Sequence, residues 1–225
     1  MPFLVLEGLD GAGKSTQINM LREYLTARGR RCRYIHFPRF DAPVYGDLIA
    51  RFLRGELGEL SQVNPYLVAL LYAGDRAEAA ETVSGWLSEG WVIADRYVYS
   101  NIGYQCAKID DAAERERLRR WILDLEYGHY RIPQPDLSLF LDVPFSFTES
   151  RLSAARTGSD RDYLHGGADI HESSLDLQRR VRQVYLDSAE KDPSLRVVDC
   201  AGKDGAMAGA ESIFERIVSR IGDIL

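Results

Sequence analysis

The feature that most constrains the fold is a glycine-rich loop close to the start of the chain. Residues 8–15 read Gly-Leu-Asp-Gly-Ala-Gly-Lys-Ser, which fits the pattern G-x-x-x-x-G-K-S/T at every fixed position. An apolar run over Phe3–Glu7 precedes the loop, and a helical pattern over Lys14–Arg28 follows it until Gly29. A strand, such a loop and a helix form the phosphate-binding unit of P-loop proteins, so the chain is predicted to fold around a parallel sheet.

The residue types of this loop suit phosphate binding. Glycines adopt positive φ, and they allow backbone N–H groups to close around phosphate oxygens. The helix that begins near Lys14 directs the positive end of its dipole at the same place. Lys14 supplies a mobile positive charge for β and γ phosphates, and Ser15 supplies an oxygen ligand for Mg²⁺.

The rest of the chain alternates short apolar runs with helical patterns, which is typical of βαβ units. Further strands are expected at Arg33–Phe37, Trp91–Ala94, Leu137–Leu141 and Arg196–Val198. Helices are expected at 41–55, from 64–65 to 83 or beyond, within 110–126 as a solvated face, at 145–155, at 173–189 and at the C-terminus. The length of 225 residues favours one domain over two. We therefore predict a single α/β domain, residues 1–225, with a three-layer P-loop fold: a mostly parallel five-stranded sheet flanked by helices, and a small lid.

One segment, 156–171, interrupts this alternation. It begins Arg-Thr-Gly-Ser-Asp-Arg-Asp-Tyr-Leu-His-Gly-Gly, with few apolar side chains, and lies between two expected helices. A loop of this length in a compact domain is usually functional or disordered. On the residues alone, a surface loop without function stays open.

Charge and composition exclude several classes of function. Lys and Arg number 28 and Asp and Glu 34, for a net charge of −6, so a general binder of nucleic acid or of anionic membranes is not expected. The 3 cysteines are far apart, and with the 4 histidines they show no metal-binding spacing, so neither a disulfide framework nor a zinc site is expected. We expect His36, His129, His165 and His171 to be structural or surface residues. No apolar run is long enough for a signal peptide or a membrane span, which predicts a cytoplasmic protein.

A P-loop alone does not distinguish GTPases, ATPases, nucleoside kinases and nucleotide kinases. The chain has no Asn-Lys-x-Asp sequence, with which a G protein reads its base. The strand Trp91–Ala94 ends in Asp95-Arg96-Tyr97 rather than in two acidic residues, which argues against a motor or AAA-type ATPase. Small size and scattered arginines favour phosphoryl transfer between two small nucleotides.

Several short sequences, taken in order, resemble the thymidylate kinase family, whose members phosphorylate dTMP. They are Glu-Gly-Leu-Asp-Gly-Ala-Gly-Lys-Ser-Thr at 7–16, Phe-Pro-Arg at 37–39, Leu-Tyr-Ala-Gly-Asp-Arg at 71–76, Asp-Arg-Tyr-Val-Tyr-Ser at 95–100, Gly-Tyr-Gln at 103–105 and Pro-Asp-Leu at 135–137. The resemblance extends from Phe3 to about Lys203. It implies transfer of the γ-phosphate of ATP to dTMP, giving dTDP and ADP for dTTP synthesis, with Mg²⁺ as cofactor, and it implies a homodimer.

The resemblance also assigns roles to residues. ATP is expected to bind at Gly8, Asp10, Gly11, Ala12, Gly13, Lys14, Ser15 and Thr16. For dTMP the expected residues are Asp10, Arg39, Tyr72, Arg76, Arg96, Ser100, Tyr104 and Gln105. In this set Tyr72 would stack on thymine, Arg76 would contact the base, and Asp10 would bind the deoxyribose 3′-hydroxyl. Arg39 and Arg96 are candidates for the acceptor phosphate. Asp95 would support Mg²⁺ together with Ser15.

Catalysis is expected to depend on positive charge rather than on a general base, because the attacking phosphate oxygen of dTMP is already anionic. The expected catalytic residues are Lys14, Arg96, Arg156 and Arg161. Some family members have an arginine inside the P-loop, where this chain has Gly11. The resemblance therefore assigns the transition-state arginines to the lid segment, at Arg156 and Arg161. It also implies that residues 201–203 lie against adenine.

Two alternatives remain open. A deoxynucleoside kinase shares the P-loop sheet, but its neutral acceptor hydroxyl needs a base, and it typically has Glu-Arg-Ser where this chain has Asp95-Arg96-Tyr97. A nucleotide-binding regulatory protein without kinase activity is the second alternative. The intact Lys14 and Ser15 and the two arginines of the lid segment argue against it.

Overall fold

The computed structural model describes residues 1–60, 62–153, 159–164, 169–172 and 174–224. A five-stranded sheet forms its centre, with the order β2-β3-β1-β4-β5 and with each neighbouring pair of strands parallel. The strands are β1 (Phe3–Gly8), β2 (Cys32–His36), β3 (Trp91–Asp95), β4 (Leu137–Asp142) and β5 (Leu195–Asp199). The predicted P-loop α/β fold with a five-stranded sheet is confirmed.

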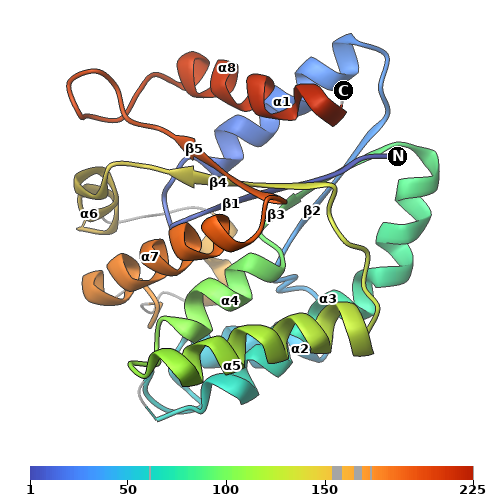
Figure 1. The fold of residues 1–225 in the computed structure, drawn as a ribbon. Coiled ribbons are helices and arrows are strands. Elements are labelled where there is room, and N and C mark those ends of the chain that lie inside the picture. Colours follow the sequence, from blue (N-terminus) through green and yellow to red (C-terminus); the bar gives the residue numbers. More distant parts are fainter. Residues whose placement is uncertain (61, 154–158, 165–168, 173, 225) are drawn as a thin grey trace.

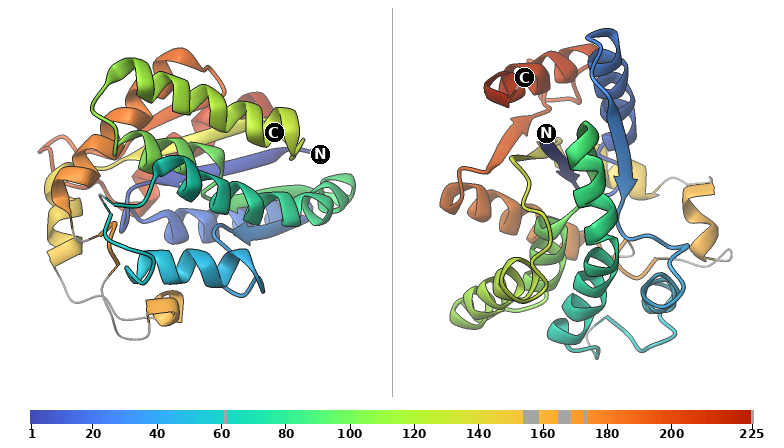
Figure 2. Two further views of the ribbon diagram at one scale, coloured as in Figure 1. Left: turned by 90° about the horizontal axis from the view of Figure 1, so that it is seen from below. Right: turned by 90° about the vertical axis from the view of Figure 1, so that its right-hand side faces the viewer.

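Helices cover both faces of the sheet (Figure 1). They are α1 (Lys14–Ala27), α2 (Tyr45–Leu53), α3 (Pro65–Glu89), α4 (Val98–Cys106), α5 (Ala112–Leu123), α6 (Phe145–Ser153), α7 (Leu175–Lys191) and α8 (Ala210–Ile221). Successive side chains of a strand point to opposite faces, so Leu4 and Leu6 pack on the side of α1 and α8, and Phe3 and Val5 pack on the side of α3, α4, α5 and α7. The right-hand panel of Figure 2 shows these two layers on either side of the sheet.

Two helical segments differ from the sequence prediction. The sequence pattern does not predict α4, because nearly all of its side chains are buried and it has no regular alternation of apolar and polar residues. The segment 110–126 is only partly the solvated helix that its charges predict. A π-helix, Asp124–His129, continues α5, and within it Glu126 is fully buried.

The topology brings distant parts of the chain to one edge of the sheet. The P-loop follows β1, and Asp95 and His36 are the last residues of the parallel strands β3 and β2. In open α/β sheets, ligands bind outside these carboxyl ends. Among the described helices, none has both the length and the apolar character that crossing a bilayer requires.

Candidate active site

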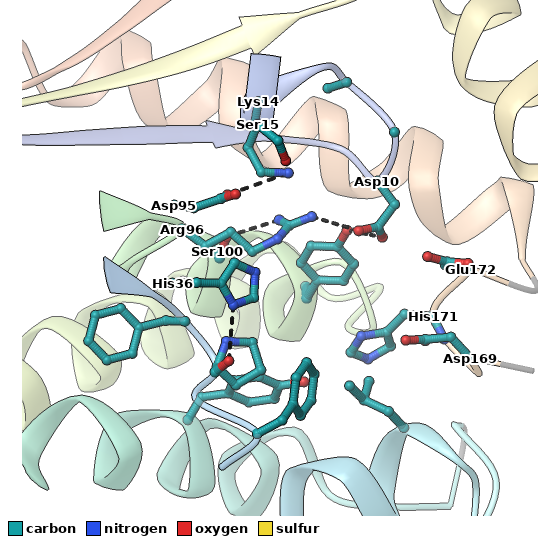
Figure 3. A pocket seen from close by; sticks show the side chains of 18 of the residues that line it. Asp10, Lys14, Ser15, His36, Asp95, Arg96, Ser100, Asp169, His171 and Glu172 are labelled. Atoms are coloured by element: carbon teal, nitrogen blue, oxygen red, sulfur yellow. Dashed lines mark hydrogen bonds and ion pairs between the residues drawn. The ribbon is translucent and has the colours of Figure 1, made fainter. Parts of the chain in front are cut away.

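A cavity of about 830 Å³ lies at the carboxyl ends of the strands. The P-loop lines one side of the cavity, and residues of α3 and α4 line the opposite side. Figure 3 shows Lys14 and Ser15 at one end, Asp10 and Arg96 in the middle, and His171 and Asp169 farther along. The cavity therefore joins a phosphate-binding end, at Lys14 and Ser15, to a second region that His171 and Asp169 line.

The phosphate-binding end is built mainly from backbone. Gly11 and Gly13 have φ of 76° and 82°, in the left-handed region that glycine adopts without strain. Gly13 directly precedes α1, and no described side chain caps this helix terminus. The first N–H groups of α1 therefore remain available to an anion at the positive end of the helix dipole.

Three side chains at this end carry the expected chemistry of a nucleotide–metal complex. Lys14 Nζ lies 3.7 Å from Asp95 Oδ1 (Figure 3), and burial, followed by the charge of Arg96, lowers the pKa of Lys14. Asp95 Oδ1 is buried and accepts no hydrogen bond from the described residues, and Ser15 exposes its side chain on the cavity wall. These oxygens fit Mg²⁺, which binds oxygen ligands and keeps several waters. The described residues contain no cluster of His, Cys, Asp and Glu that would hold a metal by itself.

Arg96 occupies the middle of the cavity in a strained conformation. Its φ of 66° is in the left-handed region, which is uncommon for a residue with a side chain and is frequent at functional sites. Its Nη2 donates to Asp10 Oδ1 at 2.7 Å, and its Nη1 donates to Ser100 Oγ at 3.1 Å. Asp10 also accepts from Tyr104 Oη at 2.7 Å. Four of the predicted site residues thus form one hydrogen-bonded group (Figure 3).

A buried glutamate beneath this group holds it in place. Glu7 accepts hydrogen bonds from Tyr97 N at 2.9 Å, from Ser100 Oγ at 2.6 Å and from Tyr185 Oη at 2.8 Å. Burial raises the pKa of Glu7, and the Ser100 hydrogen bond and the charge of Arg96 oppose that rise. Glu7 therefore fixes the backbone after β3, where the strained Arg96 lies.

The other end of the cavity is built from buried side chains. Tyr72, Arg76, Asn101 and Gln105 line it, from α3 and α4. Arg76 is 2% exposed and forms a two-pronged ion pair with Glu126, with Nε–Oε2 and Nη2–Oε1 distances of 2.5 and 2.7 Å. The structure therefore brings together the residues that the sequence assigned to the base, and it adds Asn101 and Glu126.

A segment after α6 contributes residues that the sequence analysis did not assign. Tyr163 stacks on Phe40, with ring centroids 3.8 Å apart, and donates from Oη to Asp169 Oδ2 at 2.7 Å. Burial, followed by the charge of Asp10, raises the pKa of Asp169 to about 6. Asp169, Tyr163 and Glu172 all line the cavity. Their spacing in the sequence does not indicate that they lie there.

Two of the four histidines that we expected to be structural or surface residues lie at the cavity. His36 and His171 line the cavity, and His171 is buried and stacks on Tyr104 with ring centroids 4.9 Å apart. His129 is exposed, and His165 lies outside the described residues. The absence of a metal-binding pattern does not indicate that a histidine is remote from a site.

Two other predicted site residues are placed differently. Arg39 is not among the described residues that line the cavity, because its Nε donates to Asp75 Oδ1 at 2.9 Å and its Nη2 to Glu78. The carboxylate of Asp75 is fully buried and needs such a charged partner. Gly8 is also absent from the described lining, since it ends β1 below the loop. The remaining P-loop residues from Asp10 to Thr16 line the cavity.

The lid prediction falls mostly on residues outside those described. Arg156 lies outside them, and so does the side chain of Arg161, whose backbone belongs to the 3₁₀-helix Ser159–Leu164. The structure instead shows Arg151 of α6 on the cavity wall. A Cβ on Gly11 would lie 3.1 Å from Arg151 Cβ, so the arginine stem packs directly against the P-loop. Its position on a helix that follows β4 could have indicated this placement.

The segment after β5 also reaches the P-loop. Ala201 pairs with Met207 in an isolated antiparallel bridge, and Met207 Cε lies 3.9 Å from where a Cβ on Gly13 would be. Through Met207, the segment 201–207 therefore borders the P-loop at Gly13.

Comparisons with known proteins agree on one family. The family model for thymidylate kinase matches residues 6–206. The chain is 35% identical over 189 residues to the thymidylate kinase of Mycobacterium tuberculosis, covering 83% of this chain and 85% of that protein. It is 32% identical over 229 residues to the probable thymidylate kinase of Thermococcus kodakarensis, covering 99% and 98%. The solved structure of thymidylate kinase from Candida albicans matches with a TM-score of 0.72 and 27% identity, covering 99% of this chain and 91% of that one.

Proposed function

Because the chain belongs to the thymidylate kinase family, we propose that it transfers the γ-phosphate of ATP to dTMP, giving dTDP and ADP for dTTP synthesis. One observation carries the proposal best. A single cavity joins a P-loop to a buried pocket that presents Arg76 and Asn101 beside an aromatic ring, Tyr72. The first part suits a triphosphate, and the second suits a stacked and hydrogen-bonded base.

The roles of the residues follow from their places along the cavity. Lys14 and the N-terminus of α1 hold the β and γ phosphates. Arg96, in the middle, binds the acceptor phosphate, and Asp10 with Tyr104 binds the sugar hydroxyl. Tyr72 stacks on the base. The acceptor oxygen is anionic before the reaction, so these groups act by positioning the two phosphates and by neutralising charge rather than by removing a proton.

Mg²⁺ is the divalent ion that this site fits. The Ser15 hydroxyl and the Asp95 carboxylate would hold it, the latter being the buried oxygen that accepts no hydrogen bond from the described residues. A bound Mg²⁺ neutralises charge on the phosphate oxygens of ATP. The arginines of the lid segment, Arg156 and Arg161, together with Arg151, supply further positive charge near the transferred group.

The proposal also covers the domain organisation, the location and the oligomeric state of the protein. The chain acts as one kinase domain, with a lid at about 156–171, in the cytoplasm and as a homodimer. The absence of a bilayer-length apolar helix among the described residues is compatible with this, and the family membership is the reason for proposing a dimer.

A panel of acceptors tests the function. ADP release from ATP would be measured with dTMP, dUMP, dCMP and thymidine, each with the purified full chain and Mg²⁺. We expect turnover with dTMP and none with thymidine. Turnover with thymidine in preference to dTMP would indicate a deoxynucleoside kinase, and binding of ATP without turnover of any acceptor would indicate a regulatory protein. Omission of Mg²⁺, with Mg²⁺ restored as the control, tests the cofactor.

A further inference from the structure

Glu126 is a buried carboxylate that the mechanism above does not use. It lies in the π-helix Asp124–His129, and its side chain is completely inaccessible to solvent. Segments of π-helix are rare and occur frequently at functional sites. A buried ionised carboxylate is costly unless donors surround it, so its partners indicate what it is for.

The carboxylate of Glu126 binds two residues that line the base end of the cavity. Oε2 accepts from Arg76 Nε at 2.5 Å, and Oε1 accepts from Arg76 Nη2 at 2.7 Å and from Asn101 Nδ2 at 3.0 Å. Arg76 belongs to α3 and Asn101 to α4. One carboxylate therefore sets the orientation of two side chains on different helices.

The orientation of the Asn101 amide is fixed by its partners. Its Nδ2 donates both to Glu126 Oε1 and to Ala69 O, each at 3.0 Å. Both partners are acceptors, so the nitrogen must face them. Asn101 Oδ1 then faces away, is buried, and accepts no hydrogen bond from the described residues. Asn101 lines the cavity, and a buried acceptor without a donor needs one from a ligand.

Arg76 supplies hydrogen-bond donors that complement the acceptor of Asn101. A guanidinium has five N–H donors and no acceptor, and Glu126 occupies only two of its nitrogens. Arg76 also lines the cavity, so its remaining N–H donors can serve a ligand there. The base end thus presents donors from Arg76 beside an acceptor from Asn101, in an order that Glu126 maintains.

We propose that Glu126 is a positioning residue for acceptor selection, because it fixes this order of donor and acceptor. The inference rests on the proposed function and adds to it a residue that does not itself line the cavity. A pyrimidine with a 4-keto oxygen and an N3–H offers an acceptor to Arg76 and a donor to Asn101. A 4-amino pyrimidine offers a donor and an acceptor at the same two positions, so both contacts become repulsive and two buried groups stay unpaired.

The experiment compares dTMP with dCMP in the parent chain and in Glu126→Gln. The variant keeps the shape of the side chain but introduces a donor, which competes with the present orientation of Asn101. We expect the preference for dTMP over dCMP, measured as the ratio of kcat/KM values, to fall by about tenfold, the effect of one misplaced buried hydrogen bond. The change should appear in KM for dTMP, while KM for ATP stays within about twofold of the parent value.

Two further variants complete the test. Asp124→Asn removes the same charge from an exposed position in the same π-helix and should keep the parent preference. Glu126→Asp retains the charge but shortens the side chain, so it can replace Glu126→Gln if the latter does not fold, with a loss of preference in the same direction. A thermal melting curve establishes folding for each variant.

The outcomes separate this inference from the proposed function. A folded Glu126 variant whose preference for dTMP over dCMP stays within about twofold of the parent value overturns the inference, as does an equal rise in KM for dTMP and ATP. A parent chain that does not phosphorylate dTMP overturns the proposed function instead. Calorimetric titration with dTMP and dCMP would then still measure the preference of the pocket and the effect of Glu126 on it.

Discussion

The two ends of the cavity differ in which parts of the chain form them. At the phosphate end, most of the groups that face the cavity come from one continuous loop, residues 10–16, and positive φ at Gly11 and Gly13 gives that loop its shape. At the base end, Arg76 and Asn101 line the cavity and the buried Glu126 binds both of them; the three residues belong to three helical segments and are at most 2% exposed. Backbone N–H groups recognise any phosphate, whereas a buried side-chain network can distinguish one base from another.

This difference also concerns stability. A P-loop side chain such as Lys14 faces the cavity, so it can change with little effect on the fold. The Arg76–Glu126 pair is part of the interior, and removal of one member leaves an uncompensated charge, at a typical cost of about 3–5 kcal/mol in the free energy of unfolding. The comparison predicts that variants at the phosphate end lose activity alone, and that variants at the base end change selectivity and stability together.

The largest expected effect is at the phosphate end. Lys14→Ala should lower kcat by about 1,000-fold, because it removes a cation that stabilises charge on the transferred phosphate. Its melting temperature should equal or exceed that of the parent, since burial disfavours the charged form of this lysine and lowers its pKa. The surface lysine Lys191→Ala is the control. Near-parental turnover of Lys14→Ala with an unchanged melting curve would contradict the P-loop mechanism.

The next effect concerns Arg151, which lines the cavity, and Arg156 and Arg161, which we propose to act at the phosphate end from the lid segment. We expect at least one of the variants Arg151→Ala, Arg156→Ala and Arg161→Ala to lose about 100-fold in kcat, with a smaller change in KM. Their contacts strengthen as charge shifts during transfer, which is why kcat responds more. If all three single variants and the triple variant keep kcat within a few-fold of the parent value, positive charge from this segment is not part of catalysis.

A smaller effect should separate the two ends by substrate. Tyr72→Ala should raise KM for dTMP by about tenfold and leave KM for ATP nearly unchanged, because a ring stacked on a base contributes roughly 1–3 kcal/mol. Steady-state kinetics with each substrate varied in turn gives both values. Equal changes for the two substrates would mean that Tyr72 acts through the packing of α3 rather than through the acceptor base.

The two ends of the cavity also differ in how well the sequence alone predicts them. The P-loop is contiguous, so its pattern, the preceding strand and the following helix are all visible in the sequence, and the fold prediction built on them is confirmed. Tyr72 and Arg76 are visible as neighbours on one helix and do line the cavity. Local spacing is therefore sufficient where one element supplies the groups.

Local spacing fails where several elements meet. Glu126 looks like one more charge on a solvated helix, and only the packing of the π-helix against α3 and α4 shows that it is buried. Arg39 follows a strand and has the right chemistry, but the sequence does not reveal that the buried Asp75 takes its guanidinium. His171 lies in a turn and has no partner pattern in the sequence, because its neighbour Tyr104 is far away along the chain, on α4.

The smallest expected effect is a pH dependence of stability near the junction of the two ends. Burial raises the pKa of Asp169 from 3.8 to about 6 in the folded chain. Between these values the folded state binds more protons than the unfolded state, so this carboxyl lowers the free energy of unfolding as the pH rises from about 4 to about 6. Asp169→Asn removes the ionisable carboxyl and therefore removes this loss of stability. Its melting temperature relative to the parent should therefore increase by a few degrees between pH 4.5 and pH 7, whereas the exposed Asp41→Asn should show no such trend. A melting-temperature difference between Asp169→Asn and the parent that is constant over this range, or that decreases with pH, would mean that burial beside Asp10 does not raise the pKa of Asp169.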